Sequence, residues 1–273
     1  FVLGRVSNSM RAPFLLVSRF LWICQRQGIM SIYAIGDIHG HLEKLNDVLD
    51  LITADQAKHG LQNASVVFLG DLTDRGPDSR GVMDFVIDGI AAGKPWIVIK
   101  GNHDRMFQFY LDDPSRADPK LRVDLTWMNP RLGGDTTLAS YGVKVGEDGP
   151  EQQAAARAAV PQSHVEFLQN LPFFHEHEGV FFVHAGVQPG IALADQVEDD
   201  LLWIRKEFHD SDLDHGALIV HGHTPVEAAT HYGNRVNLDT GAGYGKAISV
   251  AVFEGRDVAL LTDTGRVTLD PSA

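Results

Sequence analysis

Short apolar runs alternate with amphipathic segments along the chain from about residue 30. The apolar runs at residues 31–36, 64–70 and 95–100 predict three strands. The segments at residues 41–52 and 79–92 carry apolar residues at helical spacing and predict helices. This strand-helix-strand-helix-strand order predicts a largely parallel sheet with helices on both faces. Ligands of such sheets bind beyond the carboxyl ends of the strands, so the residues that end each run are the first candidates for function.

The pattern changes twice after residue 112. Residues 113–171 are mainly helical in pattern and more polar, and we expect a helical insertion there that forms a cap beside the site. Short strand-like runs separated by glycine-containing turns then return, which is typical of a second sheet with antiparallel character. We therefore predict an α/β fold, a two-sheet sandwich flanked by helices with a mainly helical cap region, in one catalytic domain over residues 30–273.

The first 29 residues differ from the rest, because they contain four arginines and no acidic residue. Their apolar part is shorter than the about 20 residues that span a bilayer. An Arg-rich leader is one interpretation, and an extension upstream of a natural start at Met30 is the one we favour. We expect the fold to begin at residue 30.

The net charge and the cysteine content exclude or disfavour several classes of partner and of active site. The formal net charge of −13 disfavours a nucleic-acid polymer as partner, and it means that an anionic substrate needs a local cationic site. The single cysteine, Cys24, excludes disulfides within the chain and cysteine-ligated zinc. Its place outside the predicted domain argues against a cysteine nucleophile. A reducing, cytoplasmic location fits this composition best.

Polar clusters close the predicted strands. Asp37 and His39 in GDIHG lie two residues apart, so in an extended chain they point to the same side and can reach one cation. This pair alone fits a solvated turn equally well. The cluster GDLTDRG is more specific, because Asp71 follows a buried strand, where an anion is costly unless cations neutralise it.

Neighbouring residues offer the other parts of a phosphate site. Arg75 presents a planar fork for a phosphate, and Asp74 can orient a nearby histidine. In GNHD, Asn102 offers a neutral carbonyl ligand, and His103 beside it is free to donate a proton. Two further clusters end later apolar runs: FVHAG with His184, and IVHGHTP with His221 and His223. Five clusters in such positions favour a common site over unrelated turns.

The order GDxHG, GDxxDRG, GNH with Asp or Glu, VHxG and GHT resembles the calcineurin-like metallophosphoesterases. Within them it resembles the phosphoprotein phosphatase branch, particularly small bacterial and phage serine/threonine phosphatases, from about Ile32 to about Phe253. The resemblance implies two divalent metal ions, with Mn²⁺ favoured over Fe or Zn²⁺. The implied ligands are Asp37, His39 and Asp71 for one ion, and Asp71, Asn102, His184 and His223 for the other.

The same resemblance implies a reaction on a phosphoester. A hydroxide held between the metals would attack phosphorus in line, and Arg75 with Arg205 would hold the phosphoryl oxygens. His103, oriented by Asp74, would protonate the leaving group. Lys100 stands where the family usually has Arg, so this implied substrate contact becomes a point charge.

Two residues leave the substrate class open. The motif GNHD ends in Asp104, where phosphoprotein phosphatases favour Glu and the symmetrical diadenosine tetraphosphatases carry Asp. Those hydrolases typically lack an acid at the position of Asp74, and its presence leads us to predict a serine/threonine protein phosphatase. The alternative is a symmetrical dinucleoside tetraphosphate (Ap4A) hydrolase. A binding protein on a degenerate scaffold is disfavoured, because the ligand set is complete.

Other stretches have simpler interpretations. We expect HEHE at residues 175–178 to be a solvated hairpin turn, and GAGYGKAI at residues 241–248 to be a turn near the site, since it lacks the pattern of a phosphate loop. We assign His221 no role as a metal ligand. Five further histidines are predicted to lie at the surface: His59, His164, His209, His215 and His231.

Overall fold

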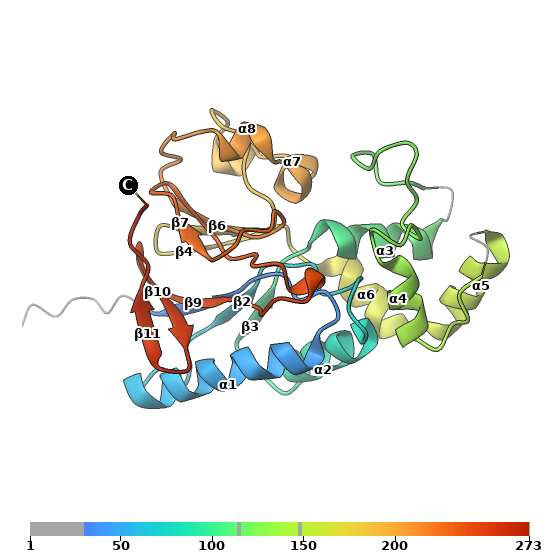
Figure 1. The fold of residues 1–273 in the computed structure, drawn as a ribbon, viewed down its shortest axis with the longest axis horizontal. Coiled ribbons are helices and arrows are strands. Elements are labelled where there is room, and N and C mark those ends of the chain that lie inside the picture. Colours follow the sequence, from blue (N-terminus) through green and yellow to red (C-terminus); the bar gives the residue numbers. More distant parts are fainter. Residues whose placement is uncertain (1–29, 114–115, 147–148, 273) are drawn as a thin grey trace, which may run out of the picture.

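The computed structural model describes residues 30–113, 116–146 and 149–272. Two β-sheets pack face to face, and helices cover their outer faces (Figure 1). The predicted α/β sandwich flanked by helices is therefore confirmed. The predicted extension at residues 1–29 lies outside the described residues.

The first sheet has six strands in the order β11-β10-β9-β1-β2-β3. Strands β1, β2 and β3 are parallel, as the first apolar runs predict, and β9, β10 and β11 continue the sheet by antiparallel pairing. The strands are β1 (Ile32–Ile35), β2 (Val66–Phe68), β3 (Trp96–Val98), β9 (Val250–Glu254), β10 (Asp257–Thr262) and β11 (Gly265–Thr268).

The second sheet has five strands in the order β4-β5-β6-β8-β7. They are β4 (Phe174–His177), β5 (Val180–Val183), β6 (Leu218–His221), β7 (Thr230–His231) and β8 (Arg235–Asn237). The expected antiparallel character holds only at the two edges, because β5, β6 and β8 run parallel. Long connections, rather than tight turns, join these three strands and permit the parallel direction.

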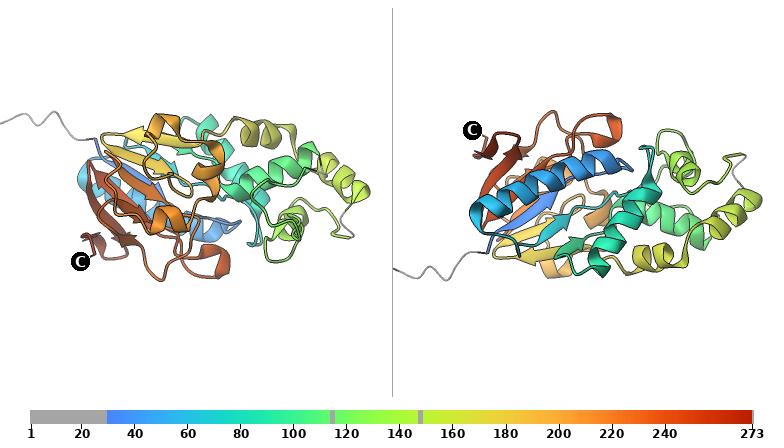
Figure 2. Two further views of the ribbon diagram at one scale, coloured as in Figure 1. Left: turned by 90° about the horizontal axis from the view of Figure 1, so that it is seen from above. Right: turned by 90° about the horizontal axis from the view of Figure 1, so that it is seen from below.

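Helices form the outer layers and one end of the sandwich. The helices are α1 (Leu42–His59), α2 (Ser79–Ala91), α3 (Asn102–Asp112), α4 (Gly134–Ser140), α5 (Pro150–Ala159), α6 (Gln162–Asn170), α7 (Glu198–Trp203) and α8 (Lys206–His209). Helices α1 and α2 lie along the first sheet, and α7 and α8 lie over the second (Figure 1). Helices α3 to α6 gather at the end opposite β10 and β11 (Figure 2). Between β3 and β4 the described residues form helices and no strand, although the status of this region as an insertion stays a prediction.

Alternation along β1 divides the core into layers. Ile32 and Ala34 pack between the two sheets, whereas Tyr33 and Ile35 pack toward the helices of the first sheet. Because both faces of the central strands are buried, their sequences are almost continuously apolar, and charged residues can appear only where the strands end. Among the described residues, no helix is long and apolar enough to cross a membrane.

A charged network ties α1 to both halves of the first sheet. Tyr33 Oη donates to Asp55 Oδ2 at 2.8 Å, and Arg266 of β11 donates to the same carboxylate through Nη2 at 2.7 Å and Nε at 2.9 Å. Burial of Asp55 would raise its pKa, but the hydrogen bonds from Arg266 and Tyr33 outweigh burial and lower the pKa. The network therefore stabilises the fold while Asp55 is ionised.

We expect Asp55→Asn to lower the free energy of unfolding by about 1.5–3 kcal/mol at pH 7, because a charge-assisted pairing is lost. The folded-state pKa is lowered, so the deficit relative to wild type is full above the unfolded pKa of about 3.9 and shrinks as the pH falls through the folded pKa. Denaturant unfolding at a series of pH values measures this. Asp47→Asn, at an exposed position of the same helix, is the control, and a deficit that persists undiminished at low pH would contradict the interpretation.

Candidate metal centre

The site lies at the carboxyl ends of strands from both sheets, where five loops meet. Strands β1, β2 and β3 lead into GDIHG, GDLTDRG and GNHD, while β5 and β6 lead into HAG and GHTP. Parallel strands end at the same edge of a sheet, which is why clusters far apart in the sequence come together.

The backbone of these loops is bent at the polar side chains. Among the described residues, six non-glycine residues have positive φ, and five of them lie in these loops: His39, Asp71, Asp74, Arg75 and His223. Each such conformation costs about 1–3 kcal/mol and persists only where the surrounding structure enforces it. The loops therefore hold their side chains in directions that a relaxed backbone would not provide.

Two glycines allow the loops to approach the carboxylates closely. A Cβ on Gly101 would lie 2.2 Å from both N and Oδ1 of Asp71, and a Cβ on Gly222 would lie 2.1 Å from Asp37 Oδ1. No side chain fits at either position without moving an acidic residue of the site.

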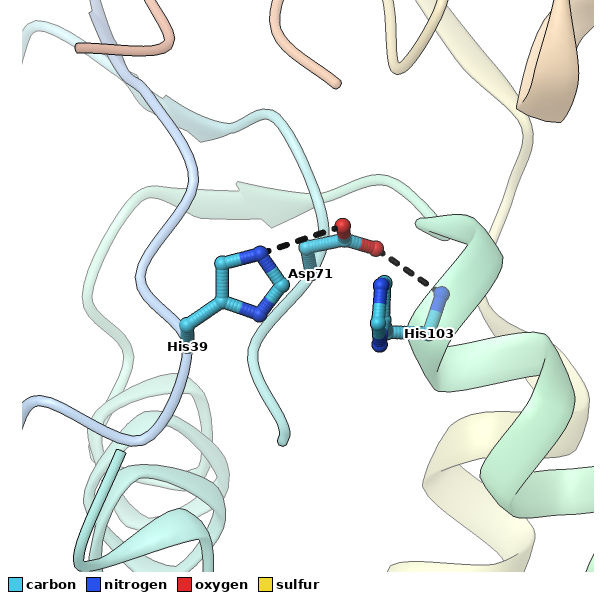
Figure 3. Close-up of side chains that lie close together, drawn as sticks. All are labelled: His39, Asp71 and His103. Carbon is cyan, nitrogen blue, oxygen red and sulfur yellow. Dashed lines mark hydrogen bonds and ion pairs between the residues drawn. The ribbon is translucent and has the colours of Figure 1, made fainter. Parts of the chain in front are cut away.

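Asp71 is shared by two groups of side chains that can hold a metal ion. One group is His39, Asp71 and His103, and the other is Asp71, His184 and His223. His39 Nε2 lies 3.5 Å from Asp71 Oδ2, and His184 Nε2 lies 3.4 Å from Asp71 Oδ1. Figure 3 shows His39 and His103 on opposite sides of the Asp71 carboxylate. His39 and His184 thus face different oxygens of the same carboxylate.

The other two implied ligands lie beside these groups. Asp37 Oδ2 is 4.0 Å from His39 Nε2, and the Asp37 carboxylate accepts from the backbone N–H of His223. Asn102 Oδ1 is 2.9 Å from His184 Nε2 and 2.8 Å from His223 Nδ1. We use the name metal cluster for the six residues Asp37, His39, Asp71, Asn102, His184 and His223, all of which are buried.

The donor atoms of the metal cluster fit divalent cations. His39 Nδ1 lies 2.9 Å from Thr73 O, and His184 Nδ1 lies 2.8 Å from Leu69 O. A carbonyl only accepts, so Nδ1 carries the proton and Nε2 of the neutral ring offers a lone pair. The Nε2 lone pairs then face oxygens of Asp71 that are also acceptors, a repulsion that a cation removes. The ring nitrogen of His223 that lies beside Asn102 Oδ1 is Nδ1, whereas its buried Nε2 has no hydrogen-bond partner among the described residues.

Burial shifts the pKa values in the cluster in opposite directions. It raises the pKa of Asp71 to about 7 and that of Asp37 well above its usual range. It lowers the pKa of His184 to about 4, and those of His39 and His223 well below the usual value. Divalent cations favour the ionised carboxylate and the neutral imidazole together, so they satisfy both halves of the cluster.

Beside the metal cluster, Asp74, Arg75 and His103 form a connected set. His103 Nδ1 lies 2.6 Å from Asp74 Oδ2, and Arg75 Nη2 lies 2.9 Å from His103 Nε2. Arg75 Nη1 also lies 2.5 Å from His39 Nε2. The guanidinium thus lies between a metal-cluster histidine and the histidine that Asp74 holds.

The two remaining predicted residues lie in different surroundings. Arg205 is exposed near the cluster, and its Nη1 donates to Thr224 Oγ1 at 3.2 Å. Lys100 is buried, its Nζ donates to Gln108 Oε1 at 2.9 Å, and it lies 5.3 Å from the Phe173 ring. The structure therefore brings Arg205 to the site but gives Lys100 partners outside the cluster. The substrate contact of Lys100 stays a prediction.

Sequence reasoning missed Asp239, and it used Asp104 only as a pointer to the substrate class. Asp239 is buried and follows β8. Burial is the main cause of the raised pKa of Asp37, and the charge of Asp239 is the next. Its position after an apolar run, as in the other clusters, was the available signal. Asp104 accepts hydrogen bonds from the backbone N–H of Gly101 and Leu72 and therefore braces the loops from beneath.

The other stretches have structural roles. His175 and His177 lie in strand β4 rather than in the turn, and His177 Nε2 contacts Met30 O at 2.8 Å. The turn at residues 241–248 lies near the site, as expected, since a Cβ on Gly243 would be 2.6 Å from the His39 ring. His221 packs edge-on against Phe208 at 5.1 Å.

The prediction of surface histidines was wrong for two positions. His164 and His231 are only 2% and 5% exposed. His164 lies between Tyr141 Oη, at 2.8 Å from Nδ1, and Asp84 Oδ1, at 2.9 Å from Nε2. A histidine on the buried side of a helix is indistinguishable in the sequence from one on its exposed side unless the register of packing is known.

Comparisons with known proteins agree with this geometry. The sequence model of the family described as calcineurin-like phosphoesterase matches residues 30–253. A relative from Oceanobacillus iheyensis, named bis(5'-nucleosyl)-tetraphosphatase PrpE (asymmetrical), is 27% identical over 251 residues, which cover 84% of this chain and 90% of the relative.

Two solved structures share the fold. A crystal structure of a putative diadenosine tetraphosphatase has a TM-score of 0.58 at 20% identity, and the match covers 89% of this chain and 96% of that one. A serine/threonine phosphatase from Saccharomyces cerevisiae has a TM-score of 0.50 at 13% identity, with 91% and 82% covered.

We expect Mn²⁺ at about 100 times its dissociation constant to raise the melting temperature of EDTA-treated wild-type protein by roughly 5–10 °C, because binding stabilises the folded state. Asp71→Asn should lose most of this shift, since both groups of ligands share Asp71. Without metal, the variant should be at least as stable as wild type at pH 7, because the raised pKa of Asp71 means that its charge destabilises the fold above the unfolded pKa. Differential scanning fluorimetry measures both effects.

Asp47→Asn, at an exposed position of α1, is the matched control and should keep the full shift. An equal metal shift in the Asp71→Asn variant would show that the cation binds elsewhere.

Proposed function

Since the chain belongs to the calcineurin-like phosphoesterase family and is a hydrolase of the metallophosphoesterase type, we propose that it cleaves phosphoanhydride bonds of dinucleoside tetraphosphates. The observation that carries the chemistry is that Asp71 lies between His39 on one side and His184 on the other, beside Arg75, where one carboxylate can be shared by two metal ions. The substrate class is supported by the relative from Oceanobacillus iheyensis, named for this activity and alignable over most of both chains.

The proposed metal ligands are the six residues of the metal cluster. Asp37, His39 and Asp71 would hold one ion, and Asp71, Asn102, His184 and His223 the other. When bound, two divalent ions would make water nucleophilic at neutral pH and neutralise charge on the phosphate. Carboxylate, amide and imidazole donors suit Mn²⁺, with Fe and Zn²⁺ as alternatives.

Two arginines would bind the phosphate chain. Arg75 has its fork directed toward the cluster, where it contacts His39 and His103. Arg205, at the exposed side, would add a second fork to a neighbouring phosphate oxygen. Together they provide the local cationic site that a chain with a net charge of −13 needs for an anionic substrate.

His103 would donate a proton to the leaving oxygen from its Nε2. In this structure Arg75 donates to Nε2 and Asp74 accepts from Nδ1–H, so this role requires Arg75 to turn to the phosphate and the ring to take up a second proton, whose charge Asp74 would balance. Asp74 holds the other ring nitrogen at 2.6 Å and so fixes the direction of the ring. The need for this proton differs between substrates, because a serine or threonine alkoxide is a strongly basic leaving group and a nucleotide phosphate is a weakly basic one.

An exposed aromatic ring also suits a nucleotide substrate. Tyr244 is 65% exposed, and the guanidinium carbon of Arg75 lies 4.9 Å from the centre of its ring. Its loop is anchored to α1, because Lys44 Nζ donates to Lys246 O at 2.7 Å. A flat ring held next to a phosphate-binding arginine is a surface on which a base can stack.

A serine/threonine protein phosphatase is the second candidate. The sequence favours it through Asp74, and the buried pair of Asp74 and His103 is the structural observation in its favour. The comparisons favour the dinucleotide reading instead. The relative is named for asymmetrical cleavage of the dinucleotide, whereas the sequence motif suggests symmetrical cleavage. A cytoplasmic location stays a prediction from cysteine content.

Initial rates on diadenosine tetraphosphate and on a phosphothreonine peptide, each with Mn²⁺ and with EDTA, test the proposal. We expect faster, metal-dependent cleavage of the dinucleotide, with Asp71→Asn as the inactive control. Chromatography of the products assigns the class, because asymmetrical hydrolysis gives ATP and AMP and symmetrical hydrolysis gives two ADP. Faster cleavage of the peptide would establish the second candidate.

We expect Tyr244→Ala to raise KM for diadenosine tetraphosphate about tenfold, the typical effect of losing one base-aromatic stack, while Tyr244→Phe stays near wild type. KM for inorganic tetraphosphate, which has no base, should not change. Tyr232→Ala is the matched control, since Tyr232 is also partly exposed and packs on an arginine, Arg235. Equal effects on both substrates would show that Tyr244 acts through Arg75 instead of a base.

A further inference from the structure

The segment of residues 127–141, between α3 and α5, reaches into the site through two side chains. Trp127 Nε1 donates to Asp74 Oδ2 at 2.8 Å, and Thr137 Oγ1 donates to Asp74 Oδ1 at 2.7 Å. With His103 Nδ1 at 2.6 Å, both oxygens of the Asp74 carboxylate have partners. All four residues are buried, so water does not compete for these hydrogen bonds. The carboxylate has a single orientation only while both donors of the segment are present.

The same segment also fixes the backbone at Asp74. The Asp74 N–H lies 2.9 Å from Thr137 Oγ1 and 3.0 Å from Ser79 Oγ, and these two hydroxyls are 2.9 Å apart. Asp74 has a φ of 74°, a conformation that a non-glycine residue adopts only under constraint. Thr137 therefore holds both the main chain and the side chain of Asp74.

A glycine pair permits this contact. Gly133 has a φ of +87°, its carbonyl accepts from the Arg75 N–H at 3.4 Å, and a Cβ there would lie 2.3 Å from Arg75 N. A Cβ on Gly134 would lie 2.6 Å from the Trp127 ring. The segment thus lies directly against the turn that carries Asp74 and Arg75.

The far side of the segment is anchored to the helices around it. The Trp127 ring stacks on Phe107 of α3 at 5.2 Å, and α3 is the helix that carries His103. Tyr141, directly after α4, is held by His164 of α6, which in turn contacts Asp84 of α2. The donors to Asp74 are consequently fixed relative to both His103 and the sheet.

We propose that Trp127 and Thr137 are positioning residues for the proton-transfer step: they lock the Asp74 carboxylate, and through it the His103 ring, in the direction of the leaving group. The proposal rests on the role of His103 in the proposed function. It assigns the helical segment a part in catalysis in addition to any part in substrate access. Its consequence is that loss of either donor impairs the reaction only where the leaving group needs a proton.

The test compares the isosteric change Thr137→Val and the change Trp127→Phe with Thr137→Ser, which keeps the hydroxyl. Thr136→Val is the matched control, because the hydroxyl of Thr136 bonds Gly133 O instead of Asp74. For each Mn²⁺-loaded variant, kcat/KM is measured on p-nitrophenyl phosphate, a good leaving group, and on a phosphothreonine peptide, a poor one. His103→Ala provides the reference for complete loss of proton transfer.

We expect Thr137→Val and Trp127→Phe to lower kcat/KM on the peptide about 10- to 100-fold, a substantial part of a general-acid effect, and to change the p-nitrophenyl phosphate rate less than about threefold. Thr137→Ser and Thr136→Val should stay near wild type. Proton NMR of the metal-free protein gives a readout without turnover: the downfield Nδ1–H resonance of His103 should move in Thr137→Val and remain in Thr136→Val.

The outcomes separate this inference from the proposed function. If His103→Ala itself shows no dependence on the leaving group, the proposed role of His103 fails and this inference with it. A second outcome is that His103→Ala shows the dependence on the leaving group while Thr137→Val lowers kcat/KM equally on both substrates, or on neither. In that case the positioning role is overturned and the role of His103 stands. A His103 Nδ1–H resonance that does not move in Thr137→Val would also overturn the positioning role.

Discussion

Burial of Asp71 at the end of a core strand is the constraint on which the rest of the structure depends. An anion in that position is unfavourable unless positive charge lies close to both of its oxygens, and burial raises its pKa to about 7. The histidines around it meet the same constraint from the other side, because burial strips them of their protons. The glycines that let the loops approach and the backbone carbonyls that orient the rings have one common effect. They bring neutral imidazoles and carboxylates to a spacing that only cations make favourable.

The sequence was informative wherever function interrupts an apolar run. The three parallel strands and the residues that follow them were predictable, because a charged residue at the end of a buried strand needs a reason. Asp239 also follows an apolar run, but the segment NLDTG around it contains no histidine that would point to a metal site. The parallel direction of β5, β6 and β8 was not predictable, since short strands and glycine turns do not specify which edges pair. The contacts of Trp127 and Thr137 were not predictable for another reason. Their partner, Asp74, lies 53 and 63 residues away in the sequence, and nothing in their local pattern differs from ordinary packing.

Some parts of the site suit both an anhydride and a phosphoester substrate, and other parts favour one of the two. In the proposed function the metal cluster and the two arginines would serve either reaction, because the phosphorus that is attacked carries the same charged oxygens in both. The pair of Asp74 and His103 has most value for a basic leaving group, whereas the exposed ring of Tyr244 has most value for a nucleotide. Asp104, which carried weight in the sequence comparison, lies beneath the loops and touches neither part. In the proposed function, substrate preference would therefore depend on one buried pair, Asp74 and His103, and on one exposed ring, that of Tyr244.

The left-handed backbone at His39, Asp71, Asp74, Arg75 and His223 has a consequence for the evolution and engineering of this protein. At each position glycine would relax the main chain, so a search for stabilising substitutions would favour the loss of the very side chains that the proposed function requires. Selection for thermal robustness alone would therefore drive such a chain toward an inert scaffold.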